Sequence, residues 1–488
     1  MRYALREIVQ ASEYRRLQGS LDTEITSVSI DSREVASEGL FIAIEGMQVD
    51  GHRYIGQAVE AGASAILCQR WPEDFAQGIT YLQVDDTARL AGMVAHRFYE
   101  EPSQAMKVVG ITGTNGKTTV ATLLYRLARA MGFKAGLIST IEIWIDQEGY
   151  PTRHTTPDAV HIHGYLSKMV EAGCRYCFME VSSHALVQER VRGIYFTGAA
   201  FTNISQDHLD YHGTFDNYIK AKKKLFDGLP EEAFALVNQD DKRGPVMLQN
   251  CRARRYGSAV RQATDYHTRI LESSPNGMRL LTNDIEWFTP LLGQFNAYNL
   301  TTVYGIAHQL GWEEEAFLPR LSQLGPVRGR FERVVDGTPF HAIVDYAHTP
   351  DALANVLATL SEVFKGQGQL ITVVGCGGNR DRSKRPQMAR ISLQYADRVV
   401  FTADNPRNEA PEDILDDMMT GVRHQDKVRV LRIVDRRSGI RTACSLARPQ
   451  DLVLVAGKGH ETYQEIKQER LPFDDREVIL EFVKDMRG

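Results

Sequence analysis

The sequence has few cysteines, no long apolar run and no marked excess of charge. Its six cysteines among 488 residues are too few for a disulfide framework. No apolar stretch approaches the ~18 residues needed to cross a bilayer, and the first six residues lack the apolar core of a signal peptide. The 62 acidic and 57 basic residues give a net charge of -5, without the basic excess typical of nucleic-acid binding. We therefore expect a cytoplasmic protein with no membrane insertion and no nucleic-acid partner.

The length of the chain indicates about three domains, since a domain averages roughly 150 residues. Two stretches rich in turn-forming residues interrupt the apolar pattern, Glu-Glu-Pro-Ser-Gln at 100–104 and Gly-Pro-Val-Arg-Gly-Arg at 325–330. They predict domains at residues 1–103, 104–326 and 327–488.

Strand-length apolar runs alternate with helix-length segments in the last third of the chain. The runs are residues 340–344, 370–374, 399–402, 428–433 and 452–456. This alternation is typical of a doubly wound parallel sheet with helices on both faces. Each run ends in a polar loop, and ligands of such sheets bind beyond the carboxyl ends of the strands. The pattern predicts a ligand site at that edge.

Residues 107–131 have the pattern of a strand, a glycine-rich turn and a helix, with the turn and helix start reading Gly-Thr-Asn-Gly-Lys-Thr-Thr at 113–119. Backbone N–H groups at the start of the helix would bind an anion. Lys117 would neutralise the β- and γ-phosphates, and the Thr118 hydroxyl would ligate Mg²⁺. The strict phosphate-loop motif requires glycine at position 111, which is isoleucine here, so the loop is a shortened variant. The pattern predicts nucleotide binding.

Two further apolar runs end in groups suited to a cation. Glu180 lies in such a run and is costly to bury unless paired or metal-bound, while His208 follows another run within a His/Asp cluster. Mg²⁺ prefers oxygen ligands, and a histidine can complete its shell beside a carboxylate. Cys174 and Cys177 lack a second pair, and we interpret them as buried thiols.

Together these motifs resemble those of the Mur ligase family, ATP-dependent enzymes of peptidoglycan precursor synthesis, over essentially the whole chain. The stretches that carry the resemblance are GTNGKTT at 113–119, EVSSH at 180–184, DHLDYH at 207–212, GQFNAYN at 293–299, GRFE at 329–332 and DYAH at 345–348. The resemblance implies an α/β fold of three domains. A smaller N-terminal α/β domain would bind a UDP-substrate, a central P-loop-type domain would bind ATP, and a C-terminal Rossmann-like domain would bind an amino acid.

The resemblance also implies roles for the residues that match the family's motifs. ATP would be bound by Gly113, Thr114, Asn115, Gly116, Lys117, Thr118, Thr119, Asn296, Arg330 and Asp345. Mg²⁺ would be held by Thr118, Glu180, His208 and Lys222, and Lys117, Glu180, His208 and Lys222 would be the catalytic residues. Lys222 matches the family's A-K-x-x-L-[FY] pattern, which implies a carbamylated lysine. The UDP-substrate would be bound by Ser32, Thr155, Thr156, Ser182, Gln188 and Arg190.

Within the family, the most discriminating marks are Thr-Thr-Pro at 155–157 and Asp-Asn-Pro-Arg at 404–407. They imply an enzyme that adds meso-diaminopimelate to the D-glutamate γ-carboxyl of UDP-N-acetylmuramoyl-L-Ala-D-Glu through an acyl phosphate, acting as a monomer. The implied diaminopimelate ligands are Arg385, Asp404, Asn405, Pro406, Arg407, Gly457 and Glu461. A zwitterionic amino-acid head calls for an arginine fork on its carboxylate and for an acid or carbonyl on its amine.

Two alternatives remain open. A ligase that adds lysine, or a folylpolyglutamate-type synthetase, would share this architecture, although the arginine-bearing loop argues against lysine and Asp-Ser-Arg at 31–33 favours a UDP-sugar. A P-loop switch or kinase without amide formation would not explain five polar loops in the third domain.

Overall fold

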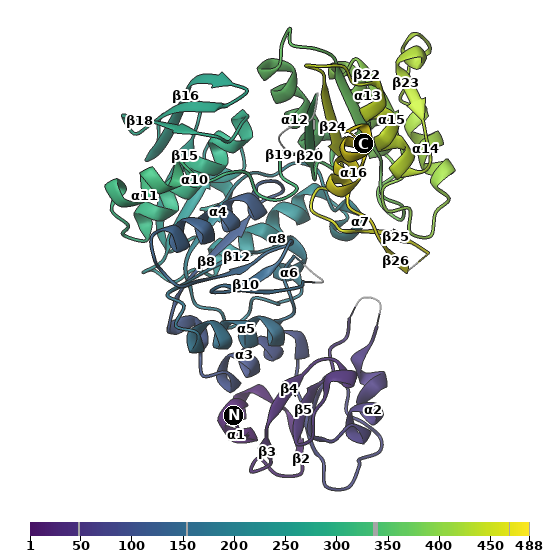
Figure 1. Ribbon diagram of the computed structural model, residues 1–488. Coiled ribbons are helices and arrows are strands. Elements are labelled where there is room, and N and C mark those ends of the chain that lie inside the picture. The colour runs from purple at the N-terminus through teal and green to yellow at the C-terminus, as the bar shows by residue number, and fades with distance from the viewer. Residues whose placement is uncertain (47–48, 153–154, 335–339, 468, 488) are drawn as a thin grey trace.

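Three lobes follow one another along the chain, and each is built on its own principal sheet (Figure 1). The computed structural model describes residues 1–46, 49–152, 155–334, 340–467 and 469–487. The principal sheets draw their strands from residues 16–83, 107–289 and 332–456. These spans fall within the three predicted domains, whose boundaries stay a prediction.

The N-terminal lobe has a five-stranded sheet that is parallel except for β2 at its edge. Its order is β2 (Arg16–Gln18), β7 (Thr80–Gln83), β6 (Ala63–Cys68), β5 (Gly39–Ile42) and β4 (Ser27–Ser29). A small antiparallel pair, β1 (Tyr3–Ala4) and β3 (Glu24–Ile25), and the helices α1 (Leu5–Ile8), α2 (Ile55–Glu60) and α3 (Thr87–Phe98) complete the lobe. Helix α3 packs on α5 (Ala159–Glu171) and so connects this lobe to the next.

The central lobe has an eleven-stranded sheet, parallel from β9 to β16 and antiparallel at both ends. Its order is β11 (Glu148–Tyr150), β10 (Ile143–Ile145), β9 (Ala135–Ile138), β12 (Tyr176–Glu180), β8 (Lys107–Thr112), β13 (Phe196–Phe201), β14 (Phe234–Asn238), β15 (Arg254–Ala259), β16 (Tyr266–Ser274), β17 (Gly277–Thr282) and β18 (Ile285–Thr289). The other helices are α4 (Lys117–Ala130), α6 (Ser183–Val187), α7 (Leu209–His212), α8 (Phe215–Asp227), α9 (Gly244–Met247), α10 (Gln294–Gln309) and α11 (Glu314–Leu321).

Both faces of the sheet are buried around its parallel strands β8, β12, β13 and β14, which explains why these strands are apolar without alternation. On β8, Val109 and Ile111 pack into the core that contains α4 and α10, whereas Val108 packs into the core that contains α5 and α8. The six cysteines are free and buried, as expected for Cys174 and Cys177.

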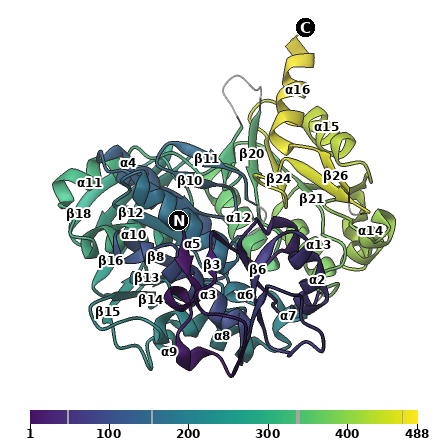
Figure 2. The same ribbon diagram turned by 90° about the horizontal axis from the view of Figure 1, so that it is seen from below.

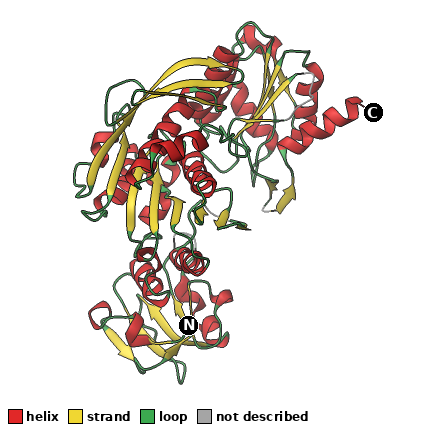
Figure 3. Cartoon of the chain, turned by 60° about the vertical axis from the view of Figure 1, so that its left-hand side comes forward, coloured by secondary structure: helices red, strands yellow, loops and turns green. Residues whose placement is uncertain are grey.

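The C-terminal lobe has a six-stranded sheet that is parallel except for β19. Its order is β19 (Glu332–Arg333), β20 (His341–Asp345), β24 (Leu452–Ala456), β21 (Leu370–Val374), β22 (Arg398–Phe401) and β23 (Val430–Arg432). One face is covered by α12 (Pro350–Val363), α13 (Lys384–Tyr395) and α14 (Pro411–Met419), the other by α15 (Arg436–Leu446) and α16 (Asp475–Arg487). Figure 3 shows helices on both sides of this sheet. A separate hairpin, β25 (Tyr463–Ile466) and β26 (Glu469–Pro472), follows β24.

The predicted α/β class, the doubly wound C-terminal sheet and the phosphate-loop arrangement of strand and helix are confirmed. The two ends of the chain lie in different lobes, and α16 projects away from the rest in the view from below (Figure 2). Within the described residues, every helix is too short or too polar to cross a membrane.

Candidate active site

The glycine-rich loop connects β8 at the centre of the sheet to the N-terminus of α4. Gly113 and Gly116 have φ angles of +149° and +88°, in the region that side chains disfavour. A Cβ atom at Gly113 would overlap the Thr202 hydroxyl, and one at Gly116 would overlap the Asn299 amide. Only glycine therefore permits this backbone path, which directs N–H groups of the first turn of α4 toward an anion.

Two lysines converge on this loop, the half-buried Lys117 and the buried Lys222. The Nζ atom of Lys117 donates hydrogen bonds to the carbonyls of Gly113 (3.0 Å) and Thr114 (2.9 Å). The Nζ atom of Lys222, from α8, donates to the same Gly113 carbonyl at 2.7 Å and lies 4.5 Å from the centre of the Tyr218 ring. Burial lowers the pKa of both amines, and for Lys222 the pKa falls well below its ordinary value.

Glu180 and His208 come from the two strands that flank β8, at the end of β12 and after β13. Glu180 ends β12, is fully buried, and accepts a hydrogen bond from the backbone N–H of Thr140 at 2.7 Å. His208 precedes α7, with its ring 4.9 Å from that of His184 and its Nε2 3.4 Å from an Asp207 carboxylate oxygen. Burial is the largest effect on His208 and lowers its pKa to about 3. The imidazole is therefore neutral at pH 7.

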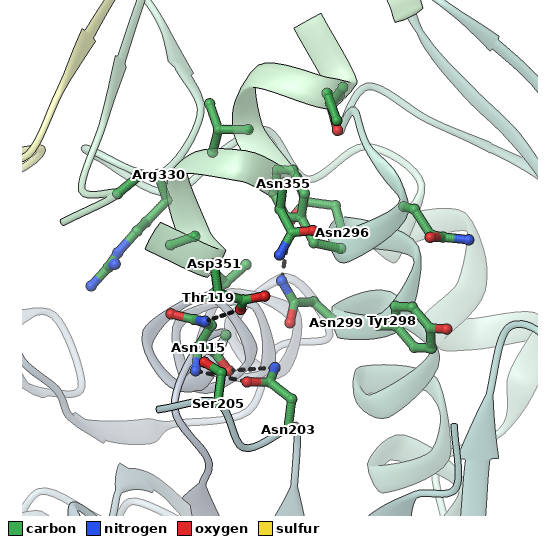
Figure 4. A pocket seen from close by; sticks show the side chains of 18 of the residues that line it. Asn115, Thr119, Asn203, Ser205, Asn296, Tyr298, Asn299, Arg330, Asp351 and Asn355 are labelled. Atoms are coloured by element: carbon green, nitrogen blue, oxygen red, sulfur yellow. Dashed lines mark hydrogen bonds between the residues drawn. The ribbon is translucent and has the colours of Figure 1, made fainter. Parts of the chain in front are cut away.

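A cavity of about 470 Å³ lies between the phosphate loop, α10 and the C-terminal lobe (Figure 4). Asn115 on the loop donates to Asp351 of α12 at 3.1 Å, and Arg330 donates to the Thr118 hydroxyl at 3.0 Å. The guanidinium of Arg330 also lies 4.4 Å from the centre of the Tyr346 ring. The central and C-terminal lobes thus share the walls of this cavity.

Most of the predicted nucleotide ligands meet at this cavity. Among its lining residues are Asn115, Gly116, Thr119, Asn296, Arg330 and Asp345. Asp345 accepts hydrogen bonds from the backbone N–H groups of Phe331 (2.6 Å) and Ala347 (2.7 Å), and burial raises its pKa. The sequence did not single out Asp351 and Asn355, which lie on α12 and also line the cavity.

A second cavity, of about 370 Å³, lies beyond the carboxyl ends of the C-terminal strands. The loops after β20, β21, β22 and β24 contribute, as expected from the polar loops in the sequence, whereas the loop after β23 supplies none of the lining residues. Its lining includes the predicted residues Asp404, Asn405, Arg407, Gly457 and Glu461, together with Thr155 from the central lobe. Pro406 belongs to the same turn but is not among the lining residues.

The structure places Arg385 outside the lining of this cavity, and its role as a diaminopimelate ligand stays a prediction. Its side chain is fully buried, and its guanidinium forms ion pairs of 2.8 Å with Glu409 and Asp417. Arg385 does not line the cavity, and its guanidinium instead connects α13 to the neighbouring loop. Arg380 lines the cavity instead, with its side chain 53% exposed and its guanidinium 3.8 Å from Asp210 of the central lobe.

A buried lysine that the sequence did not single out organises the far wall of this cavity. The Nζ atom of Lys458, a fully buried residue, donates to Asn405 Oδ1 and to Glu461 Oε2, both at 2.9 Å. The Asn405 amide in turn donates to Glu461 at 2.8 Å. Arg407 donates to the Gly378 carbonyl at 2.9 Å and contacts Glu465 at 3.2 Å. A charged hydrogen-bond network therefore orients Asn405 and Glu461.

The predicted UDP-substrate residues fall into separate places. Ser32 donates to Gln57 at 2.9 Å and lines a cavity of about 830 Å³ whose walls come from the N-terminal lobe and from the central lobe, Pro157 among them. The others lie in the central lobe, where Arg190 donates to Gln188 at 2.9 Å and to the Thr156 carbonyl at 2.8 Å. The Thr156 hydroxyl accepts from the backbone N–H of Ser182 at 3.1 Å. Thr156, Ser182, Gln188 and Arg190 thus form one hydrogen-bonded group, some distance along the chain from Ser32.

Comparisons with known proteins give this geometry a context. Three family models match in order along the chain: Mur ligase family, catalytic domain (residues 24–99), Mur ligase middle domain (111–307), and Mur ligase, glutamate ligase domain (329–459).

Relatives and solved structures agree with these matches over the full length. A UDP-N-acetylmuramoyl-L-alanyl-D-glutamate--2,6-diaminopimelate ligase of Bacteroides fragilis is 51% identical over 477 residues, which are 98% of each chain. A solved structure of an enzyme of the same name is 30% identical, with a TM-score of 0.69 and complete coverage of both chains. The MurF ligase of Thermotoga maritima in complex with ADP shares the fold at 16% identity, with a TM-score of 0.66 over 95% of this chain and 98% of that one. The chain therefore belongs to the Mur ligase family.

Proposed function

We propose that the protein adds meso-diaminopimelate to the D-glutamate γ-carboxyl of UDP-N-acetylmuramoyl-L-Ala-D-Glu, with ATP as the energy source. We call the cavity beside the phosphate loop the nucleotide cavity, and the cavity beyond the C-terminal strands the C-terminal or amino-acid cavity. The observation that carries the proposal is that the two cavities share Tyr346, His348 and Asp351 in their walls. A phosphoryl donor and an amino acid would therefore meet beside the phosphate loop. The full-length relatives named as diaminopimelate ligases support the choice of substrates.

The reaction needs activation of a carboxylate before an amine can attack it. Transfer of the γ-phosphoryl group of ATP converts the carboxylate oxygen into a phosphate leaving group, and this transfer depends on positioning and charge neutralisation. Lys117, Arg330 and the first N–H groups of α4 supply that positive charge at the nucleotide cavity. An amine then attacks the acyl phosphate, forms the C–N bond and releases inorganic phosphate. No protein nucleophile is required.

The donor set around the loop fits Mg²⁺. Thr118 offers a hydroxyl, His208 a neutral imidazole and Glu180 a buried carboxylate that has no ion-pair partner among the described residues. Nowhere in the described part of the chain do three His, Cys, Asp or Glu side chains form a ready-made metal cluster. The cation would complete its shell with phosphate oxygens and water. When bound, Mg²⁺ would neutralise the charge on the transferring phosphoryl group.

Lys222 is suited to carbamylation. It is buried without an acidic partner among the described residues, so its amine is held in the neutral, nucleophilic form. Attack of Nζ on CO₂, with loss of one proton, would give a carbamate, which is a carboxylate-like oxygen ligand. We propose that this group provides a further oxygen ligand for Mg²⁺, as the family resemblance implies.

The C-terminal cavity suits the zwitterionic far end of diaminopimelate. Arg407 and Arg380 are the arginines that line it, and we propose that they bind the distal carboxylate. Glu461 and the Gly457 carbonyl would accept hydrogen bonds from the distal ammonium. Lysine lacks that carboxylate and would make no such contact with the arginines, which argues against a lysine-adding enzyme.

The UDP-substrate would extend from the cavity at Ser32 to the group formed by Thr156, Ser182, Gln188 and Arg190, with Thr155 reaching the amino-acid cavity. We propose that one chain carries all three sites and acts as a monomer in the cytoplasm, where ATP is available.

The decisive experiment incubates the protein with ATP, Mg²⁺, UDP-N-acetylmuramoyl-L-Ala-D-Glu and either meso-diaminopimelate or L-lysine. Product mass and phosphate release are measured in parallel. We expect an amide product with diaminopimelate and a much lower rate with lysine. Equal use of lysine would contradict the assignment of the arginines, and ATP hydrolysis without any amide product would favour a nucleotide switch.

A further inference from the structure

His348 lies in the wall between the nucleotide cavity and the amino-acid cavity and has no role in the steps above. It belongs to the loop between β20 and α12, and it lines both cavities, as do Tyr346 and Asp351. A side chain in this wall faces the region where an amine from one cavity would reach a carboxylate activated in the other. The amine must lose a proton as it becomes an amide, and the steps above provide no acceptor for that proton.

A backbone hydrogen bond determines which nitrogen of His348 carries a proton. The Nδ1 atom lies 2.8 Å from the carbonyl oxygen of Tyr346. A carbonyl oxygen can only accept a hydrogen bond, so Nδ1 must be the N–H donor. In the neutral imidazole, Nε2 then carries the lone pair. The Nζ atom of Lys384 donates to the carbonyl of His348 at 3.3 Å and helps to hold this segment of the loop.

The surroundings keep the imidazole neutral and provide a counter-charge for its protonated form. Burial is the largest effect lowering the pKa of His348, and the cations of Lys384 and Arg330 lower it further. The carboxylate of Asp207 acts in the opposite direction and would stabilise the imidazolium. His460 and Asp404 also interact electrostatically with this ring, and the Tyr346 ring lies 4.6 Å from it. A neutral imidazole beside a carboxylate is the arrangement that a general base needs.

We propose that Nε2 of His348 accepts the proton lost by the attacking amine as the new C–N bond forms. The inference rests on the proposed ligase function. The nitrogen lone pair forms the bond to the acyl carbon, the N–H bond breaks toward Nε2, and the C–O bond to phosphate then breaks with its electron pair on the phosphate. The proton on Nε2 passes to solvent or to the departing phosphate, which restores the neutral ring.

Other nearby groups are less suited to this proton. The pKa of Asp207 is lowered, chiefly by His208 and His348 acting against its burial, so its carboxylate is a weak base. His208 is assigned to the cation, and its pKa of about 3 makes it a weaker base than an ordinary imidazole. Neither residue lines the nucleotide cavity, whereas His348 lines both.

The test compares the full chain with His348→Gln and His348→Asn, in the amide-forming assay and in an assay with hydroxylamine. Hydroxylamine at high concentration intercepts acyl phosphates as hydroxamates with water as the proton acceptor, and it does so without binding the arginines. We expect kcat with diaminopimelate to fall roughly 10²- to 10³-fold in both variants, the usual contribution of a general base. KM for ATP and for diaminopimelate should stay within about twofold, and hydroxamate formation should stay close to wild type.

The pH dependence gives a second readout. The acidic limb of the wild-type kcat profile should disappear in His348→Gln, since the titrating base is gone. His424→Gln, an exposed histidine far along the C-terminal lobe, is the matched control and should match the wild type.

The outcomes separate the proposals. An equal loss of hydroxamate and amide formation, an unchanged kcat or an unchanged acidic limb would overturn the role of His348. Failure of the wild type to form the diaminopimelate amide, with hydroxamate still produced from the UDP-substrate, would overturn the proposed amino acid instead. A melting curve of each variant establishes that its loss of activity is not a loss of fold.

Discussion

The Nζ atom of Lys222 donates a 2.7 Å hydrogen bond to the carbonyl oxygen of Gly113, the first glycine of the phosphate loop. This contact joins helix α8 to the loop, and the lysine side chain is buried. A buried ammonium without a carboxylate is strongly disfavoured, so the amine is neutral and available to react with CO₂.

The first prediction concerns this lysine. Lys222→Ala should lower kcat by at least about 100-fold if a carbamate binds the cation, and short carboxylic acids such as acetate or propionate should restore part of the activity. Carbon-13 NMR with labelled bicarbonate should show one carbamate signal in the wild type and none in Lys222→Ala. Lys224→Met, on an exposed position of the same helix, should keep both the signal and the activity. A wild-type protein without the carbamate signal would refute the modification.

The second prediction concerns the arginines of the amino-acid cavity. Arg407→Lys and Arg380→Lys should each raise KM for diaminopimelate by roughly 10- to 150-fold, because lysine cannot reproduce a bidentate fork worth about 1.5–3 kcal/mol. KM for ATP should not change. Steady-state kinetics check both values, and an unchanged KM for diaminopimelate in either variant would remove that arginine from the site.

The third prediction concerns Arg385, which we expect to act on stability, in contrast to Arg407 and Arg380. Arg385→Met leaves Glu409 and Asp417 without their buried partner, although both carboxylates keep some access to water. We expect the free energy of unfolding of the C-terminal lobe to fall by about 1–3 kcal/mol. Urea denaturation measures this loss. In the molecules that remain folded, KM for diaminopimelate should match the wild type, and a large increase in that KM would return Arg385 to the binding site.

The fourth prediction concerns pH and the contact between α3 and α5. His163 is fully buried, its Nε2 lies 3.0 Å from the Arg192 carbonyl, and burial lowers its pKa to about 4. The unfolded chain binds a proton near pH 6.5, so the folded protein loses stability as the pH falls from 6.5 toward 4. This residue alone should account for a loss of roughly 2 kcal/mol by pH 5.

Unfolding curves at pH 7.5 and pH 5 test this expectation. The loss of stability should be smaller in His163→Gln, which keeps a hydrogen-bond donor without a titrating ring. His424→Gln, which is exposed, should lose as much as the wild type. An identical loss in His163→Gln would show that other groups cause the acid sensitivity.

Much of the fold could be read from the sequence because local patterns specify it. The five apolar runs of the C-terminal lobe correspond to β20, β21, β22, β23 and β24 within one or two residues at most ends. The phosphate loop is equally readable, since a strand, two glycines and the start of a helix follow one another within a short stretch. In both cases the physical requirement, burial of apolar side chains or a positive φ angle, applies within a short stretch of chain.

The assignment of charged side chains could not be read in this way. Arg380 and Arg385 occur five residues apart in one polar stretch, and both are arginines after a strand. Residue 385 lies on α13, where the helix turns it toward Glu409 and Asp417, while residue 380 lies in the preceding loop and faces the cavity. The sequence does not single out Lys458 for the same reason, because its partners Asn405 and Glu461 come from different loops.

The sequence by itself therefore determined the α/β architecture, the phosphate loop and the set of polar loops from which the site is made. Only the tertiary structure decided which long charged side chains reach the cavities and which form ion pairs with one another. The reason is physical: the state of an arginine, lysine or histidine depends on burial and on partners brought together from distant parts of the chain. His348 shows this directly, since its place between two cavities exists only once the central and C-terminal lobes are assembled.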